Sequence, residues 1–316
     1  VGSEMCIRDS INATNRIGIN SADPIAGIDG QNTTAYIGNV GVGTTTLYGN
    51  SLSVYGNSSV TGSLGIGTTA RGGGATEAAA MLDIAKQHPN LVAQLVPAPM
   101  DLPVWQTVRR LISEQKLGEL REIHVDVLNG TAIDETLPLH WRHQKNYSGM
   151  NIMMFGIFAE IVTRWTGKTK SLMADAQVFI PSRIDTESEK QVQIEIPDSL
   201  GVFAKLENDI RVTYRISTVI NDRPSTSISL YGSEATLHWD GRDHLTLSKS
   251  QSETQKIPAD IKTAIGWNVE ADFVSSIREN NPVQLTSFED GLHYMKITEA
   301  VNQSLTSKNQ VNLDAI

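Results

Sequence analysis

Residues 148–167 read SGMNIMMFGIFAEIVTRWTG, and their apolar side chains recur three and four positions apart. This spacing predicts a helix that begins at Ser148, buries one apolar face and ends at Gly167. The face consists of Met150, Met153, Met154, Ile157, Phe158, Ile161 and Trp165. Such a helix needs a surface to pack against, and the following residues provide one.

Beyond Gly167 apolar and polar residues alternate, which is the pattern of half-buried strands. The alternation is clear at 192–196, 210–216, 228–230, 237–239 and 245–247. Asp240-Gly241 predicts the hairpin turn between the last two runs. Two helices follow, one around Phe273 and one that begins at the capping box Ser287-Phe288-Glu289-Asp290. We therefore expect an α+β fold in which helices cover an open antiparallel sheet.

Upstream of Ser148 the pattern is also that of a packed domain. It predicts a helix over 76–88 with Thr76 as its N-cap, and then a buried strand over 91–96. A second helix is predicted over 103–115, and Leu117-Gly118 separates it from a strand over 120–128.

The first 75 residues differ in composition from the rest. They hold 15 of the 25 glycines and no lysine, the first lysine being Lys86. Residues 1–10, VGSEMCIRDS, resemble a translated sequencing adapter, and the alternative is an ordinary disordered N-terminus. Residues 11–75 repeat the phrases VGVGTT and LGIGTT, which resemble the β-repeats of phage tail fibres. We expect this β-repeat segment to be poorly ordered alone, because short repeats need stacking neighbours.

One motif in the repeats fits a nucleotide-binding fingerprint. Gly65-x-Gly67-x-x-Ala70 satisfies the relaxed form of the glycine-rich dinucleotide loop. The fingerprint requires a helix directly after it, but Arg71-Gly72-Gly73-Gly74 follows, which is a poor helix opening. Membership of the repeat explains this motif better.

Charge and hydropathy exclude several classes of function. The net charge is −9 and there is no block of basic residues, which argues against nucleic acid and anionic membranes as partners. No apolar run approaches the ~20 residues that span a bilayer. No secretory signal is apparent, and the single cysteine, Cys6, allows no intramolecular disulfide. We therefore expect a cytoplasmic protein.

Short motifs in a fixed order resemble the Gfo/Idh/MocA family over residues 76–313. They are LPLHWR at 137–142, YSG at 147–149, RWTG at 164–167, YGSEA at 231–235, DFV at 272–274 and TSFEDGL at 286–292. The resemblance implies NAD or NADP as cofactor, a sugar or polyol as substrate, and a homo-oligomer formed through the open sheet face. Residues 76–316 would be the substrate domain, with helix 76–88 and strand 91–96 as remnants of a Rossmann domain.

The resemblance also implies the site residues. Trp141 and Arg142 occupy the position where a Trp-Arg pair approaches the cofactor, and His140 beside them is a candidate for substrate binding. Glu160 is the candidate catalytic base and Arg164 a candidate substrate-binding residue. The alternatives are a loop anchored by a buried Trp141, and a solvated ion pair between Glu160 and Arg164. We expect no metal site, because the histidines do not cluster with other ligands.

The sequence also departs from the family pattern. Phe158 and Met154 stand where relatives carry a histidine and an aspartate, and residues 71–75 replace the Glu-Lys-Pro motif with its lysine. We expect a truncated or chimeric sugar oxidoreductase that lacks the nucleotide-binding half, joined near Ala70–Thr76. The alternatives are a fibre-like, sugar-binding structural protein and a non-catalytic regulator of the same family.

Overall fold

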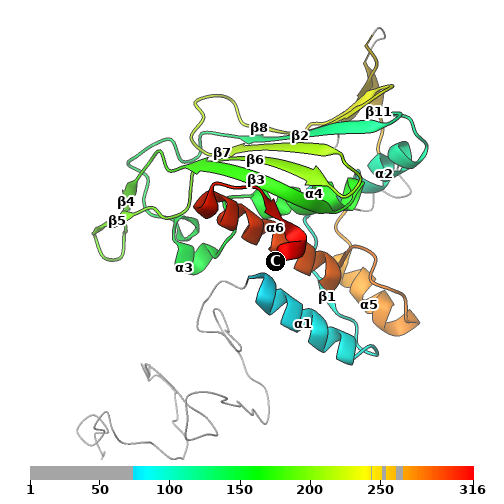
Figure 1. The fold of residues 1–316 in the computed structure, drawn as a ribbon, viewed down its shortest axis with the longest axis horizontal. Coiled ribbons are helices and arrows are strands. Elements are labelled where there is room, and N and C mark those ends of the chain that lie inside the picture. The colour runs from blue at the N-terminus through cyan, green and yellow to red at the C-terminus, as the bar shows by residue number, and fades with distance from the viewer. Residues whose placement is uncertain (1–73, 243, 251–253, 261–265) are drawn as a thin grey trace, which may run out of the picture. The chain divides into compact units, whose positions relative to one another are not determined.

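The structure is a computed structural model that describes residues 74–316, apart from residue 243 and the segments 251–253 and 261–265 (Figure 1). The adapter-like residues 1–10, the repeats up to residue 73 and the Gly65–Ala70 fingerprint lie outside the described residues. The helices are α1 (Ala75–Gln87), α2 (Trp105–Ser113), α3 (Lys145–Ser148), α4 (Phe155–Thr166), α5 (Val269–Glu279) and α6 (Phe288–Ser307), with 3-10 turns η2 (Trp141–His143) and η3 (Leu313–Ala315).

A nine-stranded sheet forms one layer of the fold, in the order β11-β10-β9-β8-β2-β7-β6-β3-β13. Its strands are β2 (Leu120–Leu128), β3 (Thr169–Gln177), β6 (Ser199–Leu206), β7 (Arg211–Ser217), β8 (Ser225–Gly232), β9 (Thr236–Trp239), β10 (Leu245–Ser248), β11 (Gln255–Ile257) and β13 (Val311–Asn312). All neighbours are antiparallel except β2 and β7, which are parallel. The predicted all-antiparallel sheet is wrong at this pair, because α4 and β3 to β6 form the crossover that parallel strands require.

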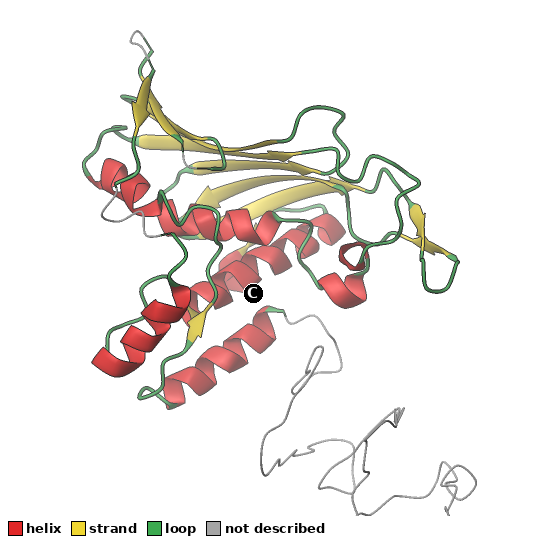
Figure 2. Cartoon of the chain, turned by 180° about the vertical axis from the view of Figure 1, so that it is seen from behind, coloured by secondary structure: helices red, strands yellow, loops and turns green. Residues whose placement is uncertain are grey.

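Helices gather on one side of the sheet and leave its other side open (Figure 2). The core lies between the two layers, where Phe155 of α4 meets Tyr214 of β7 edge to face and Trp165 meets Trp239 in the same way. The open side carries large apolar side chains: Phe203 is 64% exposed and Met173 is 47% exposed. The prediction of helices covering an open sheet is confirmed.

A smaller group of elements packs beside α6. It consists of α1 and the two-stranded sheet of β1 (Gln94–Leu95) and β12 (Thr286–Ser287). The strand predicted over 91–96 shrinks to two residues, and it is not buried, because Leu91 is 70% and Val96 68% exposed. Pairing with β12 extends over only two residues of each strand, which explains the short β1.

The N-cap predicted from the sequence is confirmed for α6 and is wrong for α1. At α6, Ser287 and Asp290 form the predicted reciprocal capping box. At α1, Thr76 lies inside the first turn and is not the N-cap. The amide of Gly74 donates instead to Glu77, and the amide of Ala75 donates to Glu299 of α6.

Two further strands, β4 (Ser182–Ile184) and β5 (Gln191–Gln193), form a separate hairpin. The strand predicted from the alternation at 192–196 extends beyond β5, which ends at Gln193. Ile194 and Ile196 are buried in the loop that follows. The strand over 120–128 is confirmed at both ends, and the Asp240-Gly241 hairpin joins β9 to β10 as predicted. The helix at 103–115 is confirmed with shorter bounds.

Candidate functional site

A pocket of about 320 Å³ opens between the loop after α3, the start of α4 and the middle of α6. Its lining mixes apolar side chains with a few polar groups. The lining residues are Tyr147, Ser148, Gly149, Met150, Asn151, Gly156, Ile157, Glu160, Tyr294, Met295 and Thr298. Concave sites of this composition, with few convergent polar groups, are typical of small-molecule binding.

The wall of the pocket is a loop where the sequence predicts a helix. Residues 149–154 are not helical, and the helix begins at Phe155 instead of Ser148. Gly149 and Met153 both have positive φ, which ends α3 and interrupts the helical path. Asn151 Oδ1 accepts the amide hydrogen of Gly156 at 3.1 Å, so a side chain takes the place of an earlier helical turn. The end of the helix at Gly167 is confirmed.

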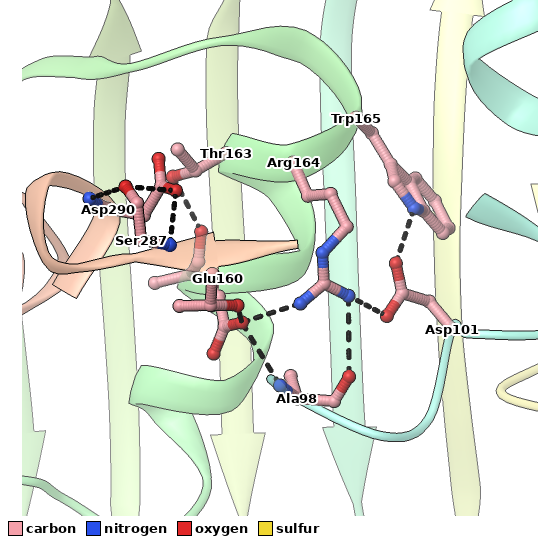
Figure 3. Close-up of polar contacts among 10 residues, drawn as sticks. Ala98, Asp101, Glu160, Thr163, Arg164, Trp165, Ser287 and Asp290 are labelled. Atoms are coloured by element: carbon pink, nitrogen blue, oxygen red, sulfur yellow. Dashed lines mark hydrogen bonds and ion pairs between the residues drawn. The ribbon is translucent and has the colours of Figure 1, made fainter. Parts of the chain in front are cut away.

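Glu160, on the second turn of α4, lies where three separate segments meet (Figure 3). Its Oε1 atom accepts hydrogen bonds from the amide of Ala98 at 3.0 Å and from the hydroxyl of Thr286 at 2.7 Å. Arg164 Nη2 donates to the same oxygen at 2.5 Å. Within the described residues, the other oxygen, Oε2, has no hydrogen-bond partner.

Arg164 lies between Glu160 and Asp101 and joins the two carboxylates (Figure 3). Its Nη1 atom donates to Asp101 and to the carbonyl of Ala98, while Trp165 Nε1 donates to Asp101 Oδ2 at 2.8 Å. Burial raises the pKa of Asp101 to about 6, because loss of solvent outweighs the opposing effects of Arg164 and Trp165. The ion pair of Glu160 with Arg164 exists, but the expectation that it is solvated is wrong: the side chains are 13% and 7% exposed.

Tyr294 enters the pocket from α6, opposite α4. Burial raises the pKa of its phenol, and the negative charge of Glu160 raises it further. Among the described residues its hydroxyl has no hydrogen-bond partner. Its neighbour His293 points elsewhere: Nε2 of His293 accepts the amide hydrogen of Thr169 at 3.1 Å, and burial lowers the pKa of this imidazole to about 4.

His140, Trp141 and Arg142 form an exposed turn that does not line the pocket. The guanidinium of Arg142 lies over the indole of Trp141, 4.1 Å from its ring centre, and His140 Nδ1 accepts the amide hydrogen of Arg142. Trp141 is 48% exposed, so the alternative of a loop anchored by a buried tryptophan is wrong. The structure therefore brings Glu160 and Arg164 together and leaves these three residues apart from them.

Sequence reasoning missed three residues of the site: Asp101, Thr286 and Tyr294. Asp101 could have been noticed because it stands within the largely apolar run 95–105. A carboxylate that is buried with such a run needs a partner. Tyr294 stands among apolar helix positions and carries no such signal. In the part of the chain that the structure describes, no three potential ligands gather in a way that could hold a metal ion. No described helix is long and apolar enough to cross a membrane.

Comparison with known proteins adds to this geometry. The GFO/IDH/MocA C-terminal domain matches residues 105–238. An uncharacterised oxidoreductase from Synechocystis is 25% identical over 138 residues, which are 43% of this chain and 37% of that protein. The chain therefore matches little more than a third of the length of that relative.

Several solved structures share the fold. An NAD-binding oxidoreductase from Klebsiella pneumoniae has a TM-score of 0.68 at 18% identity, over 76% of this chain and 71% of its own. Levoglucosan dehydrogenase in complex with NADH and L-sorbose has a TM-score of 0.65 at 20% identity, over 76% and 70%. An inositol dehydrogenase homologue from Azotobacter vinelandii, complexed with NADH and myo-inositol, has a TM-score of 0.61 at 15% identity, over 76% and 69%. Residues 105–238 thus match the C-terminal domain of the Gfo/Idh/MocA oxidoreductases, and the fold of the chain resembles that of solved oxidoreductases.

Proposed function

We propose that residues 76–316 are the substrate domain of an NAD(P)-dependent sugar or polyol oxidoreductase, with the pocket between α4 and α6 as the sugar site. The observation that carries this proposal is the free Glu160 Oε2 in a pocket that a phenol also lines. A carboxylate oxygen and a hydroxyl donor at the same cavity suit a ligand with several hydroxyl groups. The names of the structural neighbours, a levoglucosan and an inositol dehydrogenase, support the same class of ligand.

Within this proposal the residues of the site have different roles. Glu160 Oε2 accepts the hydrogen bond of a sugar hydroxyl and, in an intact enzyme, takes its proton as a general base. Arg164 does not line the pocket, so we propose that it positions Glu160 instead of contacting the sugar. His140, the other proposed substrate contact, would meet the sugar only if a ligand extends to the exposed turn.

The described residues fit a nicotinamide nucleotide poorly. Trp141 and Arg142 offer an exposed ring and a guanidinium, and we propose them as its contacts. However, no described strand is followed by a glycine-rich loop and a helix, which is how dinucleotide folds hold the pyrophosphate. When bound, the nucleotide would supply the hydride acceptor. We propose that this chain, with residues 71–75 in place of Glu-Lys-Pro, binds sugar without turning it over.

The test has two parts, both on the full chain. Titration with sugars and polyols, among them levoglucosan and myo-inositol, is expected to give saturable binding that Ile157→Trp abolishes by filling the pocket. Ile184→Trp, on the exposed β4–β5 hairpin, serves as the matched control and should bind normally. Titration of NADPH fluorescence is expected to show no micromolar binding. Micromolar NADPH affinity would refute the loss of the nucleotide site, and an Ile157→Trp variant that binds sugar normally would refute the pocket.

A non-catalytic family member that senses a sugar is the second candidate. It is favoured by Phe158, which stands at the position of the usual histidine and is fully buried in the core. Met154, at the position of the usual aspartate, packs against the same core. The two candidates share the sugar site and differ in turnover. A chimera supplied with an intact nucleotide-binding half separates them, because only the oxidoreductase would then reduce NAD or NADP.

We also propose that the chain forms a homo-oligomer through the open side of the sheet. There Met173 of β3, Phe203 of β6 and the nearby Phe179 border a shallow depression of about 500 Å³. An exposed apolar surface of this kind, rimmed by polar groups, marks interaction sites. Farther along the sheet, β2 and β7 carry charges of both signs in the pairs Glu122 with Arg211 and Asp126 with Arg215, which a second copy can complement.

A further inference from the structure

The pocket between α4 and α6 contains one charged side chain. Of its eleven lining residues only Glu160 is ionic, and none is a lysine, arginine or histidine. The cation that pairs with Glu160, Arg164, is shared between Glu160 and Asp101. Two carboxylates and one guanidinium leave one negative charge beneath the pocket, and the guanidinium is turned toward the carboxylates and away from the cavity.

Two further carboxylates lie near Met150, one of the residues that line the pocket. Glu77 and Glu299 meet at Gly74, where the Met150 side chain also makes contact. Both accept hydrogen bonds from the first amides of α1, Glu77 from Gly74 and Glu299 from Ala75. A helix N-terminus carries roughly half a positive charge, so it offsets only part of these two charges. These two carboxylates therefore add to the negative charge that Glu160 places in the pocket.

The groups free to meet a ligand have complementary roles. Glu160 Oε2 can only accept a hydrogen bond, and the Tyr294 hydroxyl can donate one. Tyr294 keeps its proton at neutral pH, since burial and the charge of Glu160 both raise its pKa. A neutral sugar hydroxyl can satisfy both groups at once, and an ammonium can pair with Glu160. A carboxylate or phosphate in the same place would face Glu160 without a cation of its own.

We propose that this pocket selects uncharged or amine-bearing sugars against acidic sugars and sugar phosphates, with Glu160 and Tyr294 as the specificity-determining contacts. The inference rests on the proposed function in taking the pocket as a sugar site. It adds the charge class of the ligand. Glu160 sets the preference for charge, and Tyr294 contributes affinity that does not depend on the charge of the ligand.

A matched series of probes tests this selection: glucose, glucosamine and glucuronate, titrated against the full chain by ligand-observed NMR at pH 8. Glucosamine is expected to bind at least as tightly as glucose, and glucuronate about tenfold more weakly or worse, because one uncompensated charge lies close by. Added salt should reduce the difference in affinity between glucose and glucuronate, because it screens the charge. Tyr294→Phe should weaken glucose and glucuronate by the same factor, leaving their ratio unchanged.

Two charge variants sharpen the result. Glu160→Gln should bring the affinities for glucosamine and glucuronate together. Glu160 also accepts hydrogen bonds from Ala98 and Thr286, which this substitution can disturb. A second variant is therefore needed that leaves these contacts intact. Met295→Lys places a cation in the pocket wall and should raise the affinity for glucuronate relative to glucose.

The outcomes are distinct. Glucuronate binding as tightly as glucose to the wild-type chain, or Met295→Lys leaving their ratio unchanged, would overturn the inference while the sugar site stands. If none of the three probes binds, the proposed function fails and the inference fails with it.

Discussion

The hydroxyl of Tyr214 is buried in the core without a hydrogen-bond partner among the described residues. Its ring packs against Phe155, and burial raises the pKa of the phenol well above its ordinary value. An unpaired buried hydroxyl costs about 1–3 kcal/mol, whereas the ring contact does not need the oxygen. Tyr214→Phe is therefore expected to leave the free energy of unfolding unchanged or raise it by about 1 kcal/mol, measured by urea denaturation. A clear loss of stability would mean that the hydroxyl has a bound partner such as water.

His293 gives the fold a dependence on pH. Its folded pKa of about 4 is below the ordinary value of 6.5, so the unfolded chain binds the proton more readily between these values. The stability that neutral His293 provides is complete above pH 6.5 and is lost as the pH falls toward 4. The loss is at most about 3.5 kcal/mol, since the pKa is lowered by about 2.5 and each unit of pKa corresponds to about 1.4 kcal/mol.

Asp101 acts in the opposite sense and has to be separated from His293. Its pKa is raised to about 6, so the folded state takes up its proton first as the pH falls, which favours folding at low pH. The test is urea denaturation between pH 4 and 7 of the wild type and of His293→Gln, which keeps an acceptor for the Thr169 amide but does not titrate. As the pH falls, the free energy of unfolding of the wild type should decrease relative to that of His293→Gln. A constant difference would contradict the assignment.

At the scale of elements, the Arg164 network fastens α4 to the segment 98–101 and, through Glu160, to β12. Removing the cation leaves two buried carboxylates without an opposite charge, and breaking a buried pair in this way costs about 3–5 kcal/mol. Arg164→Met should lower the free energy of unfolding by this amount. Arg110→Met is the matched control: its pair with Glu114 is exposed, so a loss below about 1 kcal/mol is expected. Equal losses in the two variants would show that the network contributes nothing specific.

The same elements explain how far the sequence predicted the fold. Strand β7 and the start of α6 were predictable, because Val212 and Tyr214 alternate with polar residues and Ser287 caps with Asp290. Strands β3 and β6 were not predictable from alternation. Met173 and Phe203 are exposed, and they occupy positions where a half-buried strand would carry polar residues. In the candidate site, the ion pair of Glu160 and Arg164 was predictable from their spacing of four residues. Asp101, which pairs with Arg164, and Thr286, which donates to Glu160, could not be predicted from the sequence. They lie 59 and 126 positions away from Glu160 in the chain.

At the scale of the whole molecule, those two exposed side chains lead to the last prediction. Phe203 and Met173 are neighbours across the β3–β6 pair on the open face, and burying them in a second copy removes apolar surface from water. Phe203→Lys should therefore convert the oligomer to a monomer in light scattering. Val274→Lys, on the exposed side of α5, adds the same charge elsewhere and should leave the mass unchanged.

Salt separates apolar association from association driven by charge. Two copies that each carry a net charge of −9 repel one another, and added salt screens this repulsion. If the face of β3 and β6 joins the copies by apolar burial, the oligomer should persist or strengthen as salt increases. If the pairs Glu122–Arg211 and Asp126–Arg215 join them instead, salt should dissociate it. An oligomer that survives both high salt and Phe203→Lys would have to use another surface of the chain.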